Sequence, residues 1–512
     1  MSDLAIVDSS KPPFLDRVGL GGFPWVTASV LYTISYGWFW NVRNSYWADD
    51  WTSYRFRASW TFDYGALGFP PWFGFHLLLH KWFGPAFLHL LIFVCFFLSA
   101  VFFYGILKKV DLLNFEQRKF ATLLFLLLPF NSSRVTLMTF HYTTAYLMFF
   151  LAWYLTIIFK SNRIKVCAVL LFFLSFQMHS LPIFFALPIL HLLILDHPRN
   201  WRGLIIWAQN NSYLILVSPL YWILRWFFWN TTMTGYHNPS LPQIWFTTRI
   251  LLIPGVSVVA LFCIAKYRAF SHRSSFYLIT FSIFAIFVGL APYVLYGAFH
   301  GPVALKAGIG LTAGYWVYFL GRSEWSDRHL ILQPLGFSLL VCSLFYFIPT
   351  NLRKVRIWSR NLVIGLCVLV NVCFGFEYLM TYSKEQVVIN ELKNRGNELS
   401  VTDYKFIDRS GYLNVRGTPL SSFGMLGSSY GFDNYARFDH SDNECVSADN
   451  VRLVVIDGEK SFWKAMQNWL SHRSFGFSVE IFDGPVSCTA DLVSNFGRGT
   501  QIPILLYFRD QD

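Results

Sequence analysis

The chain has 512 residues, of which 54% are hydrophobic and only 14% charged, and its mean hydropathy is +0.42. These values exclude an ordinary soluble domain and are typical of an integral membrane protein. The formal net charge of +12 does not indicate nucleic-acid binding, because the cations cluster in short loops between apolar runs and form no basic polar segment.

A membrane-spanning helix needs ~20 mostly apolar residues, and about eleven stretches approach that length. Residues 1–20 contain Asp3, Asp8 and Asp16 and lack an apolar core, so we expect a retained first span and no cleavable signal peptide. The predicted spans lie near 24–42, 86–107, 119–131, 142–159, 166–180, 181–195, 204–228, 248–265, 275–297, 329–349 and 361–382.

The loops between these stretches alternate in charge, and this alternation predicts orientation. Short, cation-rich loops lie at 108–119, 160–165, 199–202, 266–273 and 353–360. Longer loops with few cations lie at 41–85, 131–141, 229–247 and 298–328. We therefore place the first set in the cytoplasm and the second set outside it, with the inner (plasma) membrane of a bacterium as the expected location. The apolar stretch 303–320 is interpreted as an interfacial or re-entrant piece of an outer loop, because counting it as a span would reverse this asymmetry.

The composition changes after about residue 383. Polar turns alternate there with strand-like runs at 451–456 and 502–508, and 460–470 reads as one helix. The sequence thus predicts a membrane domain over 1–382, followed by a soluble extracytoplasmic α/β domain over 383–512. The tail cysteines, Cys445 and Cys488, can pair in an oxidising compartment or stay unpaired.

Two adjacent carboxylates, Asp49 and Asp50, follow the first predicted span within "SYWADDWTSYRFR". At the membrane surface such a group can take a proton from an attacking hydroxyl. The pair can also hold a divalent cation such as Mg²⁺ or Mn²⁺ through oxygen ligands. The alternative is a solvated loop whose tryptophans are interfacial anchors. Arg55 and Arg57, just behind, are further candidates for the same site.

Cations recur near the last outer loop. Arg328 and His329 stand at the mouth of a predicted span, where a guanidinium can clasp a phosphate with two parallel hydrogen bonds. Lys306 is a second candidate for phosphate contact, and the alternative for such residues is an interfacial, snorkelling role. His141 and His300 lie at the edges of outer loops, where they can line a polar site or serve as structural hydrogen-bonding groups.

These features together resemble the GT-C superfamily of integral-membrane glycosyltransferases. The resemblance covers roughly 20–382 and rests on "YWADDW" in a long first outer loop, on many further spans, and on "SDRHLILQPLG" entering a late helix. It implies a polyprenyl-phosphate-linked sugar donor, transfer with inversion, and a glycan, lipid or protein acceptor outside the cytoplasm. It also implies that Asp49 or Asp50 is the catalytic acidic residue, acting as general base, and that Arg328 contacts the donor phosphate.

Transfer from a lipid phosphate develops negative charge on the leaving phosphate, which cations stabilise, so the chemistry agrees with the resemblance. A lipid or saccharide transporter is the main alternative. It would favour ionisable residues in mid-span and an internal repeat, whereas Arg225 and Glu377 lie toward span ends and no repeat is visible. A receptor or scaffold would explain the tail but not the acidic pair. A membrane acyltransferase would need a buried histidine such as His179.

Overall fold

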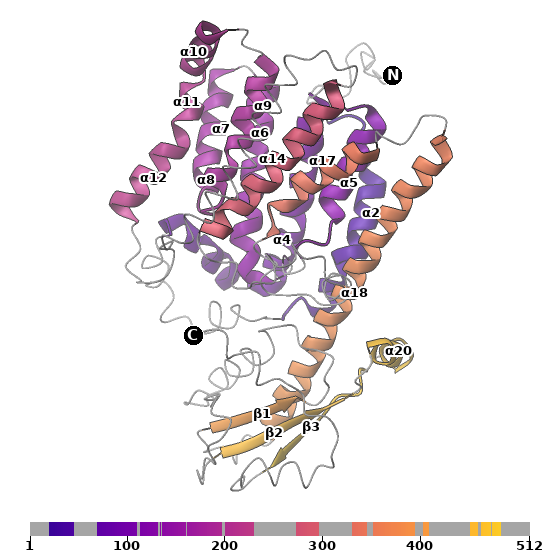
Figure 1. Ribbon diagram of the computed structural model, residues 1–512. Helices are drawn as coiled ribbons and strands as arrows, with labels where there is room; N and C mark the ends of the chain where they lie inside the picture. Colours follow the sequence, from indigo (N-terminus) through magenta and orange to yellow (C-terminus); the bar gives the residue numbers. More distant parts are fainter. Residues whose placement is uncertain are drawn as a thin grey trace, which may run out of the picture. The chain divides into compact units, whose positions relative to one another are not determined.

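The computed structural model describes fourteen ranges of the chain, and these are mostly helical (Figure 1). The described residues are 20–45, 69–109, 113–131, 134, 136–159, 161–196, 200–229, 273–295, 330–345, 352–394, 403–408, 451–458, 462–472 and 474–482. They belong to two compact units. Within the described ranges the chain passes from the first unit to the second after Trp38, and again after Val372 within one long helix, α18 (Arg353–Asn394).

The first unit is a bundle of helices. Helix α6 packs against α4 and α7, and α5 packs against α2, α4 and α17, while α14 pairs with α17 (Figure 1). The elements are α2 (Trp25–Tyr36), η3 (Pro71–Gly74), α4 (Phe75–Lys108), α5 (Phe115–Leu127), η5 (Leu137–Thr139), α6 (Phe140–Ile158), α7 (Asn162–Ser175), α8 (Leu181–Phe184), α9 (Ala186–Asp196), α10 (Trp201–Asn210), α11 (Ser212–Ile215), α12 (Val217–Phe228), α14 (Arg273–Leu295) and α17 (Gln333–Leu344).

Aromatic rings form the centre of this bundle. Phe125 of α5 lies 4.6 Å from Phe103, 5.8 Å from Tyr146 and 5.2 Å from Phe150, measured between ring centroids. All four side chains are buried. Contacts of this kind contribute about 0.5–1.5 kcal/mol per pair beyond their buried area. The chain's large share of aromatic residues, 20%, is thus used to join α4, α5 and α6.

Helix α4 is broken near its start. Gly84 has φ 77° and ψ 179°, a conformation that a residue with a side chain adopts only under strain, and Pro85 follows it. The break separates a short segment, 75–83, from a long helix that begins at Pro85. At 1.5 Å per residue the long helix measures about 35 Å, enough for a hydrocarbon core of about 30 Å. It coincides with the span predicted over 86–107.

Among the described residues, two helices are long and apolar enough to cross a membrane, Pro71–Lys108 and Arg353–Met380. The second exposes an apolar stripe at helical spacing, formed by Val355, Trp358, Leu362, Leu366 and Leu369. Such a stripe is typical of a helix that faces lipid. The total of about eleven crossings stays a prediction, because the predicted span 248–265 lies outside the described residues. The stretch 303–320, interpreted as an interfacial or re-entrant piece, also lies outside them.

Helix α5 differs from its predicted span. It covers 13 residues and ends at Leu127, so at 1.5 Å per residue it is about 20 Å long and too short to cross a bilayer by itself. Leu128 is extended (ψ 128°) because it precedes Pro129, and a residue before proline avoids the helical region. The chain therefore leaves the helix early, and Asn131, expected in an outer loop, is buried.

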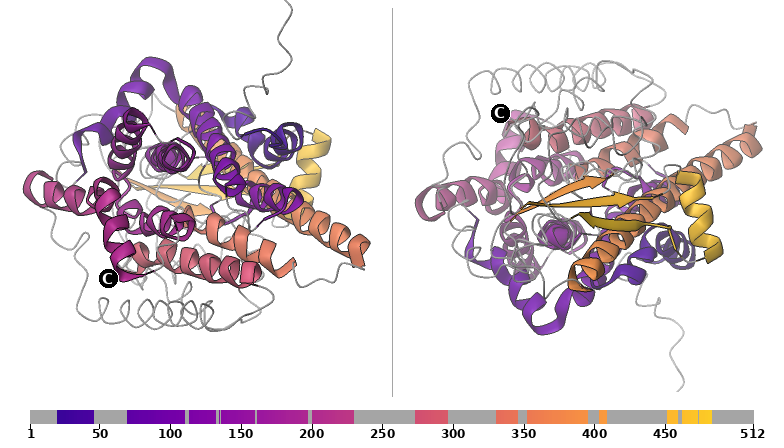
Figure 2. Two further views of the ribbon diagram at one scale, coloured as in Figure 1. Left: turned by 90° about the horizontal axis from the view of Figure 1, so that it is seen from above. Right: turned by 90° about the horizontal axis from the view of Figure 1, so that it is seen from below.

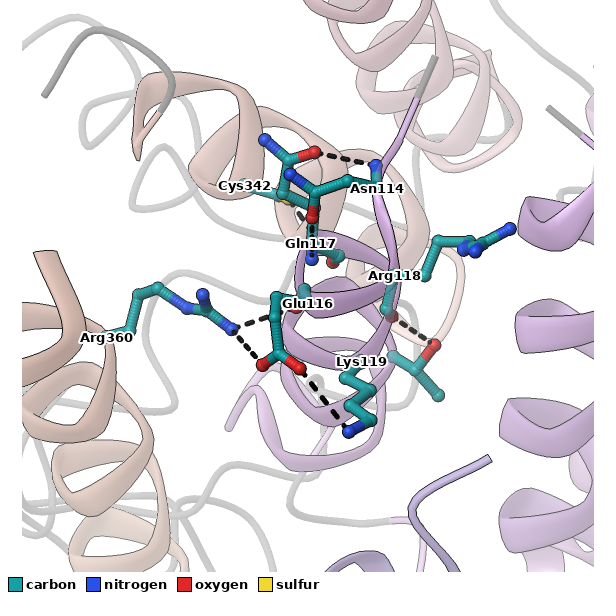
Figure 3. A network of polar contacts seen from close by, with 8 residues as sticks. Asn114, Glu116, Gln117, Arg118, Lys119, Cys342 and Arg360 are labelled. Atoms are coloured by element: carbon teal, nitrogen blue, oxygen red, sulfur yellow. Dashed lines mark hydrogen bonds and ion pairs between the residues drawn. The ribbon is translucent and has the colours of Figure 1, made fainter. Parts of the chain in front are cut away.

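The start of α5 is held by polar contacts (Figure 3). Asn114 and Gln117 form a capping box, with side-chain to backbone hydrogen bonds of 3.0 and 2.8 Å. Arg360 of α18 donates a 2.9 Å hydrogen bond to the Glu116 carbonyl and lies 3.9 Å from its carboxylate, which also meets Lys119 at 3.4 Å. This junction lies at the cation-rich, predicted cytoplasmic, ends of α5 and α18.

The second unit contains a three-stranded sheet. Strand β2 (Val451–Asp457) lies between β1 (Asp403–Asp408), which is parallel to it, and β3 (Ser478–Phe482), which is antiparallel (Figures 1 and 2). Helix α20 (Phe462–His472) follows β2, and its Trp469 packs on Phe376 of α18 with centroids 5.3 Å apart. The strand predicted at 451–456 is confirmed by β2, and the described part of the helix predicted at 460–470 lies in α20. The run 502–508, Cys445 and Cys488 lie outside the described residues.

Candidate functional site

The structure describes one of the site residues predicted from the sequence, His141. The others lie outside the described residues: Asp49, Asp50, Arg55, Arg57, His300, Lys306, Arg328 and His329.

His141 lies in the first turn of α6 and is buried, with 3% of its surface exposed. Its ring lies 4.2 Å from Phe73 of η3, between centroids, and 5.7 Å from His76 of α4. Its backbone carbonyl accepts a 3.2 Å hydrogen bond from Nε2 of Gln177, which follows α7. The start of α4, the start of α6 and the end of α7 thus meet around one imidazole, at the end of the bundle predicted to be extracytoplasmic.

Four rings form a continuous stack at this end of the bundle. His179 stacks on Phe69 at 4.7 Å, Phe69 stacks on Phe73 at 4.1 Å, and Phe73 contacts His141 at 4.2 Å. We call His179, Phe69, Phe73 and His141 the aromatic column. Phe69 and Phe73 both belong to the predicted outer loop 41–85, so the column holds the described part of that range against α6 and the end of α7.

The sequence at 69–74 explains why the column forms. Pro70 is extended (ψ 157°) and Pro71 occupies the first position of η3, because a proline lacks the N–H that later helical positions need. The chain therefore turns from an extended entry into one 3₁₀ turn, which places Phe73 near Phe69. Trp72 points to a different neighbour, and its Nε1 donates a 3.3 Å hydrogen bond to the Leu174 carbonyl.

Two further histidines lie beside the column on the short segment of α4. His76 is buried, and its Nδ1 lies 2.7 Å from the Phe73 carbonyl. Because a carbonyl only accepts hydrogen bonds, Nδ1 carries the proton and Nε2 of the neutral ring is the acceptor. His80 is buried one turn further along, whereas Phe75, Leu78 and Trp82 on the same segment are exposed. The segment is thus amphipathic, with its imidazoles toward the protein.

An arginine lies near the same end of the bundle, on α12. Val217, Tyr221 and Arg225 form the buried stripe of this helix, and the guanidinium of Arg225 lies 5.1 Å from the Trp222 ring. Trp229, just after α12, contacts Trp72 with centroids 5.1 Å apart. Arg225 is therefore a buried cation within the bundle wall next to η3.

These groups suit particular kinds of chemistry. Neutral imidazoles can accept or relay protons, and aromatic faces can stack on sugar rings. Within the described part of the chain, no group of three or more His, Cys, Asp or Glu residues is arranged to hold a metal ion. The divalent cation predicted at Asp49 and Asp50 concerns residues outside that part.

Sequence reasoning identified His141 but not its surroundings. His76 and His80 carried a usable signal, since they are four residues apart and share a face of an otherwise apolar helix. His179 drew attention only as a candidate acyltransferase histidine. No protein-family model, curated protein or solved structure matches the chain.

Proposed function

We propose that this chain is an integral-membrane glycosyltransferase of the GT-C type. It moves a sugar from a polyprenyl-phosphate-linked donor to an extracytoplasmic glycan, lipid or protein, with inversion at the anomeric carbon. The single observation that carries the proposal is the acidic pair Asp49-Asp50 in the predicted first outer loop, 41–85, a range that also supplies Phe69 and Phe73 of the aromatic column. An acidic pair at a membrane surface suits a reaction in which an acceptor hydroxyl loses its proton.

Each group has a separate task in this proposal. Asp49 or Asp50 removes the proton from the acceptor hydroxyl, alone or while the pair holds Mg²⁺ or Mn²⁺. The column holds Phe69 and Phe73, which belong to the predicted first outer loop, in a fixed position. Charge on the leaving phosphate is stabilised by cations from the last outer loop and the first. These cations are Lys306, Arg328, His329, Arg55 and Arg57.

The architecture is part of the proposal as well. Residues 1–382 form a membrane domain with about eleven crossings of ~20 apolar residues each. Residues 383–512 form a soluble α/β domain outside the cytoplasm, built on the strands β1 to β3. Both lie in or at the inner (plasma) membrane of a bacterium, in keeping with the loop charges.

Lipid or saccharide transport is the second candidate function. Buried arginines favour it, because ionisable groups inside a helical membrane bundle often mark a substrate pathway. Arg225 on α12 and Arg134, between α5 and η5, are both buried. A transporter would move its lipid-linked sugar between leaflets without cleaving it.

The test uses the full chain in nanodiscs, supplied with polyprenyl-phosphate sugars and soluble acceptors. Asp49→Asn, Asp50→Asn and the double variant are compared with Asp63→Asn, a matched substitution in the same loop. We expect sugar transfer or donor hydrolysis to fall at least about 100-fold in the double variant, as loss of a general base predicts, and to stay within about 2-fold in the control. Full transfer by the double variant would exclude the catalytic role. Donor translocation without cleavage would identify a transporter.

A further inference from the structure

Arg134 lies in a 3₁₀ turn inside the bundle, and its backbone N–H donates a 3.4 Å hydrogen bond to the Asn131 carbonyl. It falls between α5 and η5, where α5 has ended early, and only 2% of its surface is exposed. Burial lowers the pKa of Arg134 to about 10, so the guanidinium keeps its charge at neutral pH.

The guanidinium is held in one orientation. Its Nη1 donates a 3.3 Å hydrogen bond to the Leu126 carbonyl. The Cζ atom lies 3.5 Å from the Tyr36 ring centroid and 4.2 Å from that of Phe96, so the cation is sandwiched by aromatic faces. The Arg134 carbonyl accepts a 2.8 Å hydrogen bond from Thr139 Oγ1, which also fixes the backbone.

The walls around this cation are themselves held in place. The Tyr36 hydroxyl donates a 2.7 Å hydrogen bond to Asn371 Oδ1, and Asn371 Nδ2 donates a 2.7 Å hydrogen bond to the Leu127 carbonyl. Asn371 is fully buried. The network links α2, the end of α5 and α18, so the ring over Arg134 cannot rotate away without breaking a buried hydrogen bond.

Two donors of Arg134 have no partner among the described residues. Nε and Nη2 are buried, neither forms a hydrogen bond with the described part of the chain, and Arg134 makes no ion pair with a described carboxylate. Nε–H and Nη2–H point in the same direction along one edge of the planar guanidinium, and with this edge arginine binds two oxygens of one oxyanion. Burying a charge without a counter-charge is costly. An anion bound at this unpaired edge would therefore stabilise the folded protein.

We propose that the Nε–Nη2 edge of Arg134 is a binding site for a phosphate oxyanion, held by two parallel hydrogen bonds between aromatic walls. The ligand is a lipid phosphate or free phosphate, since both present the same pair of oxygens. Phosphate is favoured over carboxylate because lipid headgroups surround the bundle with phosphate at high local concentration. The proposal does not depend on the glycosyltransferase function, because it uses none of the residues predicted for catalysis.

Arg225 provides a matched comparison. It is also buried and also contacts an aromatic ring, but in the described structure only its Nε is a buried donor without a partner. A single N–H cannot form the two-oxygen contact. Arg134→Lys and Arg225→Lys each keep the positive charge and remove the planar guanidinium. The two substitutions differ in that Arg134 has both Nε and Nη2 unpaired before the change, whereas Arg225 has only Nε unpaired among its buried donors in the described structure.

The test measures the melting temperature Tm of the full chain, purified without phosphate in a maltoside detergent, at constant ionic strength. Inorganic phosphate and dodecyl phosphate are the two ligand arms, and acetate and chloride are the controls. Because Arg134 is almost fully covered, samples are equilibrated for hours before measurement. We expect phosphate or dodecyl phosphate to raise Tm by about 2 °C or more, through binding to the folded state.

The pattern across arms and variants decides the outcome. Stabilisation by both ligands identifies a free-phosphate site, and stabilisation by dodecyl phosphate alone identifies a lipid-phosphate site. In either case we expect the shift to disappear in Arg134→Lys and to persist in Arg225→Lys. Hydrogen–deuterium exchange of the unsubstituted chain gives a second measurement that needs no variant, with slower exchange expected in peptides covering 126–139. No stabilisation, an equal shift with acetate, a shift retained in Arg134→Lys, or unchanged exchange at 126–139 would overturn the proposal.

Discussion

Gly336→Ala perturbs the closest approach of two helices in the bundle, α14 and α17. A methyl group on Gly336 would lie 2.6 Å from Ile286 Cγ1, 2.7 Å from the Ile286 backbone nitrogen and 3.0 Å from the Ser282 carbonyl oxygen. Two of these three atoms belong to the backbone, so no side-chain rotation relieves the overlap. The helices must separate, and contacts along their whole interface weaken.

The expected magnitude follows from two opposing effects. Overpacking a close contact costs about 1–3 kcal/mol, whereas replacing glycine by alanine inside a helix returns up to about 1 kcal/mol of backbone entropy. The net loss in the free energy of unfolding is therefore about 1–2 kcal/mol. Gly365→Ala in α18 is the matched control, because no heavy atom lies within 4 Å of the methyl group that it adds. Without overlap, this substitution leaves stability unchanged or raises it by up to about 1 kcal/mol.

The assay is reversible unfolding in mixed detergent and dodecyl sulfate micelles, followed by tryptophan fluorescence. The two variants should differ by about 2 kcal/mol, with Gly336→Ala the less stable. Equal stability of the two variants would show that α14 and α17 do not approach as closely as described. A stabilised Gly336→Ala would refute the packing argument altogether.

Three further substitutions test the polar contacts. Tyr36→Phe leaves Asn371 Oδ1 buried without its donor, so we expect the free energy of unfolding to fall by about 1–2 kcal/mol. A double-mutant cycle with Asn371→Leu should show a coupling energy of at least about 0.5 kcal/mol, and additive losses would argue against the hydrogen bond. Asn114→Ala removes the α5 capping box and should cost about 1 kcal/mol of unfolding free energy, whereas an unchanged value would mean that α5 begins elsewhere. Glu116→Gln should change stability by less than about 1 kcal/mol, because the carboxylate side chain that pairs with Arg360 and Lys119 is exposed to solvent, and a larger loss would indicate a buried pair.

The sequence predicted the long helices well and their interruptions poorly. Helix α6 (Phe140–Ile158) and the long part of α4 coincide with predicted spans, because an unbroken apolar run of that length favours one helix. The prediction missed the early end of α5, because the apolar run continues through Phe130. Pro129 is the signal in the sequence that indicates this end. Hydropathy identifies which residues avoid water, but backbone geometry decides where a helix ends.

The candidate site was predicted only in part, for a different reason. His141 stands at the edge of an apolar run, which sequence can recognise. Its neighbours Phe69, Phe73 and His179 come from separate elements that meet only in the folded bundle. In a chain with 54 phenylalanines, single aromatic residues give no pattern that distinguishes a site from ordinary core. Tertiary packing supplies that information, and local sequence does not.

Two sets of buried polar groups in the first unit occur next to breaks in its helices. His76 and His80 of α4 lie between the Pro70-Pro71 turn and the Gly84 break, and Arg134 follows the early end of α5 at Pro129. An intact helix satisfies its own backbone and presents mainly side chains, whereas a break frees carbonyls such as those of Leu126 and Phe73 to orient a buried guanidinium or imidazole. Prolines that interrupt apolar runs are therefore better pointers to polar sites in this chain than the charged residues themselves.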